Sequence, residues 1–187
     1  MTRLMIIVAS IREGRKGLPI GRWVRSEVEK DGRFEVDWVD LRELNLPIMD
    51  EPNHPMLGQY TQDHSKAWSE RVDAADAFIF VQPEYNHSFS PALKNALDYL
   101  HREWGRKPLG TVSYGGISGG TRGVASLRPV TTVLGLVATR ANVELAWAGN
   151  QIEDDVFSPR ESQGSTLRAM LDELKTLDMT LRPLRDN

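Results

Sequence analysis

The sequence contains no cysteine. Without a thiol the chain cannot form disulfides, thiolate metal sites or iron–sulfur clusters, and mechanisms with a cysteine nucleophile are excluded. The four histidines lack ligand-like spacing with carboxylates, and Asp154 with Asp155 is typical of a solvated loop, so we expect no metal site. A chain without cysteine suits a reducing compartment, and we expect the protein in the cytoplasm.

Excess positive charge and long apolar runs are also missing. Lysine and arginine number 23 against 26 aspartates and glutamates, for a net charge of -3, whereas nucleic-acid binding usually requires a basic surface. The N-terminal apolar stretch stops at Ser10, which makes it too short for a signal peptide or a membrane span. We therefore expect neither nucleic acid nor a membrane as a partner.

The remaining composition is that of an ordinary globular protein. Hydrophobic residues make up 40% and charged residues 26% of the 187 positions. A chain of this length can bury a full core, and we expect one domain over residues 1–187.

Short apolar runs alternate with longer segments of helical periodicity. The expected strands are 4–8, 34–39, 77–81, 109–113 and 140–145, and the expected helices are 19–30, 65–75, 91–100, 124–137 and 165–181. This alternation predicts an α/β fold, a doubly wound five-stranded parallel sheet of order 2-1-3-4-5 with helices on both faces. We expect loops at 44–60 and 148–162. Because ligands of such sheets bind at the carboxyl ends of the strands, the loops after strands one, three and four are expected to form the site.

The loop after the first strand has the composition of an anion site. Residues 10–17 supply a hydroxyl at Ser10, cations that include Arg12 and Arg15, and two glycines, and they lead into a helix. Free N–H groups, the helix dipole and arginine favour phosphate, and a solvated polar turn is the alternative. The glycine fingerprint of dinucleotide sites and the loop of nucleoside triphosphatases are both absent.

The other two loops offer surfaces for a flat ring. The loop after the third strand holds Tyr85, Asn86 and His87, which combine an aromatic wall with hydrogen-bonding groups, while Ser90 is also explained as the N-cap of the next helix. The loop after the fourth strand has four glycines within 115–120, which would let the backbone approach a ligand; a flexible surface loop is the alternative. A phosphate loop beside two ring loops favours a mononucleotide, and FMN fits better than an adenine nucleotide.

The residues around the third loop resemble a known family. The match rests on the runs Pro83-Glu84-Tyr85-Asn86-His87-Ser88 and Pro91-Ala92-Leu93-Lys94-Asn95-Ala96-Leu97-Asp98. These runs are similar to the NADPH-dependent FMN reductases of the flavodoxin-like superfamily. The resemblance implies a flavodoxin-like FMN-binding domain, with FMN held by Ser10, Arg12, Arg15, Leu18, Pro19, Ile20, Pro83, Glu84, Tyr85, Asn86, Ser113, Gly115, Gly116 and Gly119.

The resemblance also implies an activity and an assembly. NADPH or NADH would deliver hydride to flavin N5, and a quinone or similar small molecule would accept it, with Tyr85 and His87 at the acceptor pocket. No side chain is assigned as catalytic, because the cofactor carries the chemistry. The family implies a homodimer or homotetramer. A flavodoxin-type electron carrier, or a flavin-sensing protein without turnover, is the alternative.

Overall fold

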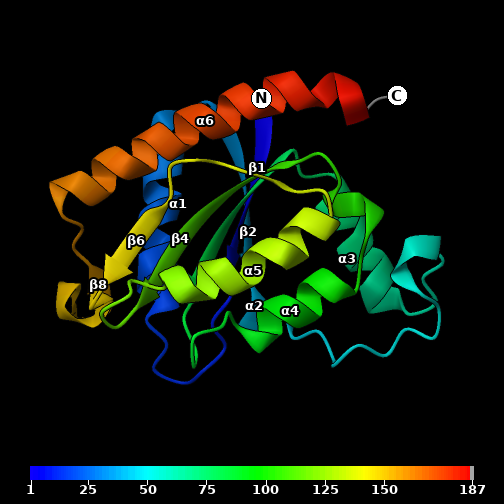
Figure 1. Ribbon diagram of the computed structural model, residues 1–187, viewed down its shortest axis with the longest axis horizontal. Coiled ribbons are helices and arrows are strands. Elements are labelled where there is room, and N and C mark those ends of the chain that lie inside the picture. Colours follow the sequence, from blue (N-terminus) through cyan, green and yellow to red (C-terminus); the bar gives the residue numbers. More distant parts are fainter. Residues whose placement is uncertain (186–187) are drawn as a thin grey trace.

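The computed structural model describes residues 1–185, in which strands and helices alternate along the chain (Figure 1). The strands are β1 (Thr2–Val8), β2 (Phe34–Asp40), β3 (Ala77–Pro83), β4 (Pro108–Gly115), β5 (Val137–Ala138), β6 (Val143–Ala146), β7 (Ile152–Glu153) and β8 (Val156–Phe157). The α-helices are α1 (Gly17–Asp31), α2 (Leu41–Leu44), α3 (Asp63–Asp73), α4 (Pro91–Asp98), α5 (Thr121–Val133) and α6 (Glu161–Arg185). Residues 1–185 also contain three short 3-10 helices, η1 (Pro55–Leu57), η2 (Arg102–Trp104) and η3 (Ala148–Gln151).

The main sheet is parallel and has the order β2-β1-β3-β4-β5, as the sequence predicts, with β6 also paired to β4. β1 lies between β2 and β3, so the direction in which the chain winds reverses there, and the carboxyl ends of β1 and β3 flank this switch point. The residues of β3 are buried throughout, whereas the edge strand β2 also has half-buried positions and one exposed position, Glu35. Continuous burial is expected where helices cover both faces of a parallel strand.

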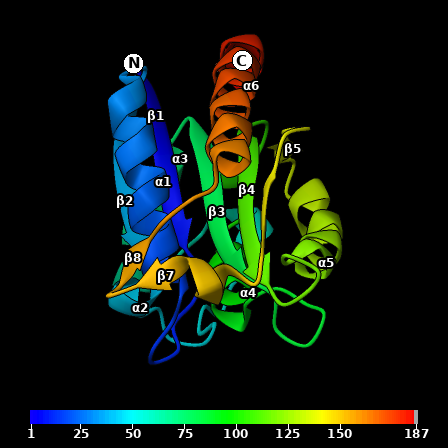
Figure 2. The ribbon, with the colours of Figure 1, turned by 90° about the vertical axis from the view of Figure 1, so that its left-hand side faces the viewer.

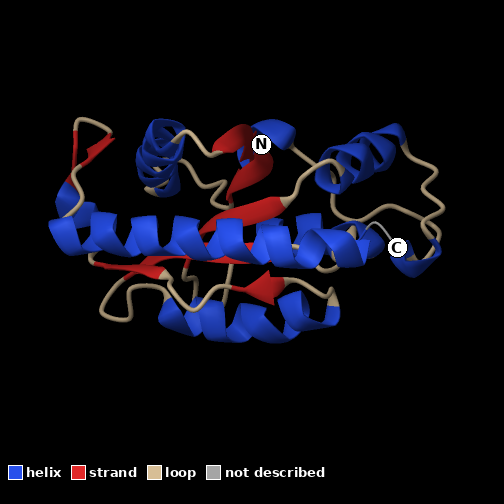
Figure 3. Cartoon of the chain, turned by 90° about the horizontal axis from the view of Figure 1, so that it is seen from above, coloured by secondary structure: helices blue, strands red, loops and turns tan. Residues whose placement is uncertain are grey.

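Two apolar cores lie on opposite faces of the sheet. Alternate side chains of β1 reach opposite faces, with Leu4 and Ile6 in one core and Met5 and Ile7 in the other. Helices α1 and α6 cover the first face, and α3, α4 and α5 cover the second (Figures 2 and 3). The predicted helices on both faces are thereby confirmed. None of the helices within residues 1–185 has both the length and the apolar character of a membrane span.

The predicted fifth strand is wrong in its extent. The sequence pattern predicts one strand over 140–145, whereas β5 and β6 pair with opposite ends of β4. Between them the hydroxyl of Thr139 donates to the carbonyl two residues on at 2.9 Å, and the amide oxygen of Asn142 accepts from the Thr111 hydroxyl at 2.8 Å. Side-chain hydrogen bonds of this kind compete with strand pairing, and they divide the strand in two.

Helix α5 is displaced from its predicted range of 124–137. It begins at Thr121, where the Glu84 carboxylate accepts hydrogen bonds from backbone N–H groups of its first turn. It ends at Val133, shortly before Gly135, whose φ of 75° suits a chain leaving a helix. Pro129 consequently lies in the helix interior.

Residues 148–162 are also more ordered than the loop that the sequence predicts. They contain η3, the antiparallel hairpin β7–β8 and the start of α6. Asp154 and Asp155 form the hairpin turn, with φ of 48° and 59°. Two successive residues of positive φ are typical of tight hairpin turns, and this explains the acidic pair structurally.

Candidate functional site

A cavity of about 410 Å³ opens at the carboxyl ends of β1, β3 and β4. The loops after all three strands line it, through segments 12–16, 83–85 and 114–116. A fourth segment, residues 147–150 after β6, completes the wall. The structure therefore brings the three predicted loops together and adds one that sequence reasoning missed.

Two buried hydroxyl groups lie where α1 begins. Ser10 is 1% exposed and Tyr114 is 7% exposed, and neither hydroxyl has a well-aligned partner among the described residues. Burial raises the pKa of Tyr114 by more than the neighbouring Ser10 hydroxyl lowers it, so the phenol stays protonated. Both groups lie against Gly17, where a Cβ would meet the Tyr114 oxygen at 2.5 Å. Tyr114 lines the cavity, whereas the predicted site residue Ser10 does not. Unsatisfied buried donors cost free energy, so both hydroxyls keep hydrogen-bonding capacity at the start of α1.

The three cations of the first loop have different surroundings. The Arg15 guanidinium makes a bidentate contact with Asp40, which raises the pKa of Arg15, and their side chains are 8% and 0% exposed. The Arg12 guanidinium carbon lies 5.9 Å from the centroid of the Tyr85 ring, within cation–π range. Arg12 and Lys16 form no ion pair within residues 1–185. These two therefore carry the positive charge that remains free for a ligand.

The first turn of α1 lies behind the loop. Pro19 has no N–H group, and the N–H of Ile20 donates to the Lys16 carbonyl at 3.4 Å. Pro19 and Ile20 are buried, and neither they nor Leu18 line the cavity. Among Leu18, Pro19 and Ile20, only Leu18 has an N–H group in the first turn that makes no intrahelical hydrogen bond.

The loop after β3 makes a tight turn. Tyr85 and Ser88 exchange backbone hydrogen bonds of 2.8 and 2.9 Å, and Asn86 and His87 between them have φ of 48° and 66°. Tyr85 lines the cavity, and burial raises the pKa of its phenol. Asn86 and His87 lie outside the lining, and His87 Nε2 is 2.6 Å from Arg122 Nη1 on α5. The structure thus places the His87 side chain against Arg122 of α5 instead of in the cavity.

Glu84 joins the β3 and β4 loops. Its carboxylate accepts from the Ser118 hydroxyl at 2.8 Å and from the N–H groups of Arg122 and Gly123 at 3.1 and 3.3 Å. The Arg122 guanidinium lies 3.0 Å away. Burial opposes ionisation of this carboxyl, but the Ser118 and backbone hydrogen bonds outweigh it and lower the pKa of Glu84. The carboxylate therefore holds the two loops together, while buried Pro83 completes the strand before it.

The glycine loop after β4 has an inner and an outer part. Gly115 and Gly116 line the cavity. Ser113 is buried, and its hydroxyl donates to the Gly119 carbonyl at 2.9 Å. Gly119 has a φ of 60°, and a Cβ there would lie 3.1 Å from the Ala146 backbone nitrogen. Ser113 and Gly119 thus fix the loop against β6 from outside the cavity lining.

Trp147 stands at the edge of the cavity in an uncommon conformation. Its φ is 53°, its side chain is exposed, and its N–H donates to the carbonyls of Gly115 and Gly116 at 3.1 and 3.2 Å. A Cβ on Gly116 would lie 3.7 Å from the indole. A bulky residue of positive φ is a genuine outlier, and the two hydrogen bonds hold it beside the glycine loop.

Ser90 occupies the N-cap position of α4, as the sequence predicts. Its hydroxyl, however, donates to the Ala9 carbonyl at 2.7 Å and makes no capping hydrogen bond. Ser90 therefore ties the end of β1 to the start of α4, which fixes the first loop relative to the β3 loop.

Eight residues that line the cavity are not among the predicted site residues: Glu13, Gly14, Lys16, Tyr114, Trp147, Ala148, Gly149 and Asn150. Tyr114 directly precedes the glycine loop, and Lys16 directly follows Arg15. Segment 147–150 follows the last strand of the sheet, so the position rule that identifies the other loops would also have identified this one. Within residues 1–185 no cluster of three potential metal ligands is present.

A second, larger hollow of about 1030 Å³ lies between α4 and the segment after α2. Its lining includes Leu46, Met49 and Phe89, and the exposed ion pair of Lys94 with Asp98 stands at its border. It is mainly apolar and separate in lining from the first cavity.

Comparison with known proteins identifies the family. The family model described as NADPH-dependent FMN reductase matches residues 2–148, most of the chain. The chain belongs to this family. An NAD(P)H-dependent FMN reductase of Schizosaccharomyces pombe is 42% identical over 120 residues, 63% of this chain and 60% of the relative. A probable NADPH:quinone oxidoreductase of Oryza sativa is 42% identical over 140 residues, 71% of this chain and 65% of the relative.

The fold of this FMN reductase family member is shared with solved structures. The flavoenzyme NAD(P)H:(acceptor) oxidoreductase FerB of Paracoccus denitrificans superimposes with a TM-score of 0.77 at 20% identity, covering 94% of this chain and 98% of that one. A flavodoxin of Streptococcus pneumoniae has a TM-score of 0.59. The flavodoxin-like fold is thereby confirmed. In both sequence relatives the matched segment spans less than two thirds of the protein, and residues 149–150 of the cavity wall follow the segment matched by the family model.

Proposed function

We propose that the protein is an FMN-dependent NAD(P)H oxidoreductase that passes hydride to a quinone or similar small acceptor. The observation that carries this proposal is the cavity at the switch point, where the three loops of the matched region converge. Relatives named as FMN reductase and as quinone oxidoreductase support both halves of the reaction.

The end of the cavity near α1 fits the phosphate of FMN. The hydroxyls of Ser10 and Tyr114 are buried donors without aligned partners, and Gly17 leaves space beside them. Helix N-termini favour phosphate through their free N–H groups and dipole. Arg12 would add charge from the cavity rim. Arg15 would shape the loop through its contact with Asp40, and Leu18, Pro19 and Ile20 would form the helix end behind it.

The other end of the cavity fits the flavin ring and its ribityl chain. Tyr85 and the adjoining Pro83 and Glu84 form one wall, and Gly115 with Gly116 forms the other. Glycines allow the backbone to approach a flat ring closely. Three predicted residues would support the site without contacting the flavin directly. Asn86 lies in the turn after β3, and the hydrogen bond between Ser113 and Gly119 holds the glycine loop in place.

Bound FMN would supply the redox chemistry, accepting hydride from NADPH or NADH and giving it to the acceptor. The residues of this chain position the ring and the reactants. The Glu84 carboxylate keeps the two ring walls at a fixed separation, and Tyr85 offers an aromatic edge to the acceptor. No acid, base or nucleophile from the protein is assigned. His87 would influence acceptor binding through Arg122 rather than by direct contact.

The alternative is a flavodoxin-type electron carrier or a flavin sensor without turnover. A net charge of -3 is mild for an electron carrier that docks through acidic surface. The test has two stages. Apoprotein is titrated with FMN by fluorescence, and saturable binding near one per chain is expected. Oxidation of NADPH and of NADH is then followed with a benzoquinone acceptor. Binding without catalysed oxidation of either donor would favour the alternative, and the absence of binding would refute both.

We further propose that this single flavodoxin-like domain of residues 1–187 acts in the cytoplasm as a homodimer or homotetramer. The apolar hollow beside α4 supports self-association, since such surfaces are uncommon on monomers. The absence of cysteine supports a reducing compartment. Sedimentation equilibrium tests the assembly, and a monomer at all concentrations would contradict it.

A further inference from the structure

Lys16 is the one cation of the first loop that neither an ion pair nor an aromatic ring engages within residues 1–185. Arg15 is held by Asp40, and Arg12 lies over the Tyr85 ring. Lys16 lines the cavity directly before Gly17, the residue at which α1 begins and the two orphan hydroxyls meet. Its place in sequence and its lack of a partner make it available to a ligand anion at that helix end.

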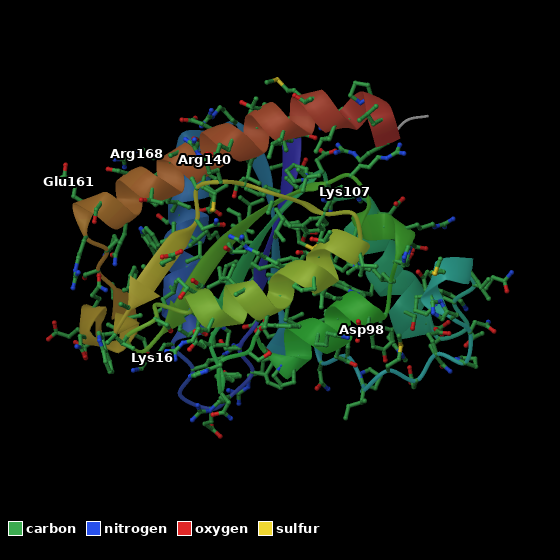
Figure 4. The ribbon with its side chains drawn as sticks, in the orientation of Figure 1. Lys16, Asp98, Lys107, Arg140, Glu161 and Arg168 are labelled. Carbon is green, nitrogen blue, oxygen red and sulfur yellow. The ribbon has the colours of Figure 1, made fainter. Side chains whose placement is uncertain are left out.

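The path of the Lys16 side chain is set by a residue far along the chain. A Cβ at Gly149 would overlap Lys16 Nζ and would lie 2.9 Å from Cε and 3.4 Å from Cδ. The outer half of the lysine therefore lies along the bare backbone of Gly149. Figure 4 shows Lys16 at this border, between the loop after β1 and the segment after β6. Gly149 has no positive φ, so its backbone conformation does not require glycine, but the path that the Lys16 side chain takes does.

We propose that Lys16, held along Gly149, is the cation that makes this site select a phosphorylated flavin over an unphosphorylated one. The assignment rests on the proposed function, because it concerns the phosphate of the proposed FMN. The three cations then have different roles: Arg15 maintains the loop, Arg12 adds charge from the rim beside the Tyr85 ring, and Lys16 neutralises the phosphate. Glu13 also lines the cavity and adds negative charge beside them, which makes an unpaired ammonium more necessary for a dianionic ligand.

The arrangement has a steric requirement that can be tested without removing the charge. An alanine at position 149 would collide with the flexible end of the lysine and not with backbone. The fold should therefore persist while Lys16 is pushed from its path. Lys16→Met removes the charge and Gly149→Ala displaces it. Both variants are therefore expected to weaken binding of the phosphorylated flavin more than binding of the unphosphorylated one.

The experiment measures dissociation constants for FMN and riboflavin, which differ only in the phosphate, by flavin fluorescence with wild type and variants. Lys16→Met is expected to weaken FMN binding about 10-fold to 30-fold and riboflavin binding by less than about 2-fold, because a charge-assisted contact to phosphate is lost. Gly149→Ala is expected to weaken FMN about 3-fold to 10-fold with the same selectivity. The double variant is expected to be no weaker than Lys16→Met alone, since one interaction is removed twice.

Two matched controls accompany these variants. Lys30→Met removes an exposed lysine at the far end of α1, and Gly164→Ala adds a methyl group where the nearest atom of Arg168 is 3.6 Å away. Neither is expected to change binding of either flavin. Circular dichroism and the thermal unfolding midpoint verify that all five variants, the double variant included, are folded.

Several outcomes would overturn the assignment. Equal loss of FMN and riboflavin in Lys16→Met would show that the residue acts on the ring or on the fold, and unchanged FMN binding would show that it does not contact the phosphate. An additive double variant would separate Gly149 from Lys16. Wild-type protein that binds neither flavin would refute the proposed function and this assignment with it. If wild type binds FMN but Lys16→Met binds it equally well, the assignment of Lys16 is refuted and the proposed function stands.

Discussion

The buried contact between Arg15 and Asp40 is expected to be a principal source of stability in the first loop. Both side chains are almost wholly buried, Arg15 also donates to the Ser10 carbonyl at 2.8 Å, and Asp40 also accepts from the Arg42 N–H at 3.0 Å. In Asp40→Ala the Arg15 charge keeps its burial and loses its partner. Breaking a buried pair in this way costs about 3–5 kcal/mol.

The expected shift in melting temperature follows from the size of the chain. An unfolding entropy of about 2.1 cal/mol/K per residue gives roughly 390 cal/mol/K for 187 residues. A loss of about 3–5 kcal/mol therefore corresponds to a Tm lower by about 8 to 13 °C. Calorimetry or circular dichroism on apoprotein measures this shift directly, without any contribution from ligand.

A double variant separates the pair from its surroundings. Arg15→Leu with Asp40→Leu removes both charges, so it is expected to be more stable than the sum of the two single variants predicts, because no lone buried charge remains. A shift below about 2 °C in Asp40→Ala, or strict additivity in the double variant, would refute the argument. Arg15→Leu is also expected to weaken FMN and riboflavin equally, in contrast to Lys16→Met.

Three further changes probe other parts of the molecule. Burial lowers the pKa of Lys107 to about 8 from an ordinary value of 10.5. Between these two pH values the unfolded chain binds more protons than the folded one, so the stability of wild type relative to Lys107→Met is expected to rise from pH 8 to pH 10.5. Urea unfolding measures this difference, and a difference that stays constant with pH would contradict the expectation. Gly17→Ala places a Cβ against the Ser10 and Tyr114 hydroxyls, so FMN affinity is expected to fall at least about 10-fold, and unchanged titration curves would show that the hydroxyls do not face the ligand. Trp147 is expected to lose most of its fluorescence when FMN binds. The difference between wild type and Trp147→Phe isolates its signal, and an unquenched signal would place the indole away from the ring.

The sheet order could be predicted because its determinants are local. The runs 4–8 and 77–81 are continuously apolar, and that pattern by itself indicates strands covered on both faces. Alternation with helices and the handedness of the connections then leave few topologies. The fifth strand was predicted with wrong limits because its division depends on Thr139 and Asn142, whose hydrogen-bonding partners include Thr111 on the neighbouring strand. The pattern of apolar residues along the chain does not predict polar contacts of this kind.

The position of the site could be predicted, but the partners of its side chains could not. Arg15 follows Ser10 closely in a loop that favours anions, and this suggested direct phosphate binding. Its engagement by Asp40 depends on the register that sets Asp40 beside Val8. Likewise, the contact of His87 with Arg122 depends on where α5 begins, and Glu84 determines that. Side-chain pairing between elements is a property of the assembled sheet.

The fourth wall of the cavity has a consequence for how the protein is made. Residues 12–16, 83–85 and 114–116 leave the ribosome before Trp147 and Gly149. These two emerge only after β6 and must then dock against the glycine loop and Lys16. Domains acquire structure from the N-terminus during synthesis, so a nascent chain carries three sides of the cavity before the last is available. Ligand capture by the growing chain would therefore have to wait until residues 147–150 emerge, and a chain truncated before residue 147 would expose an open groove to solvent.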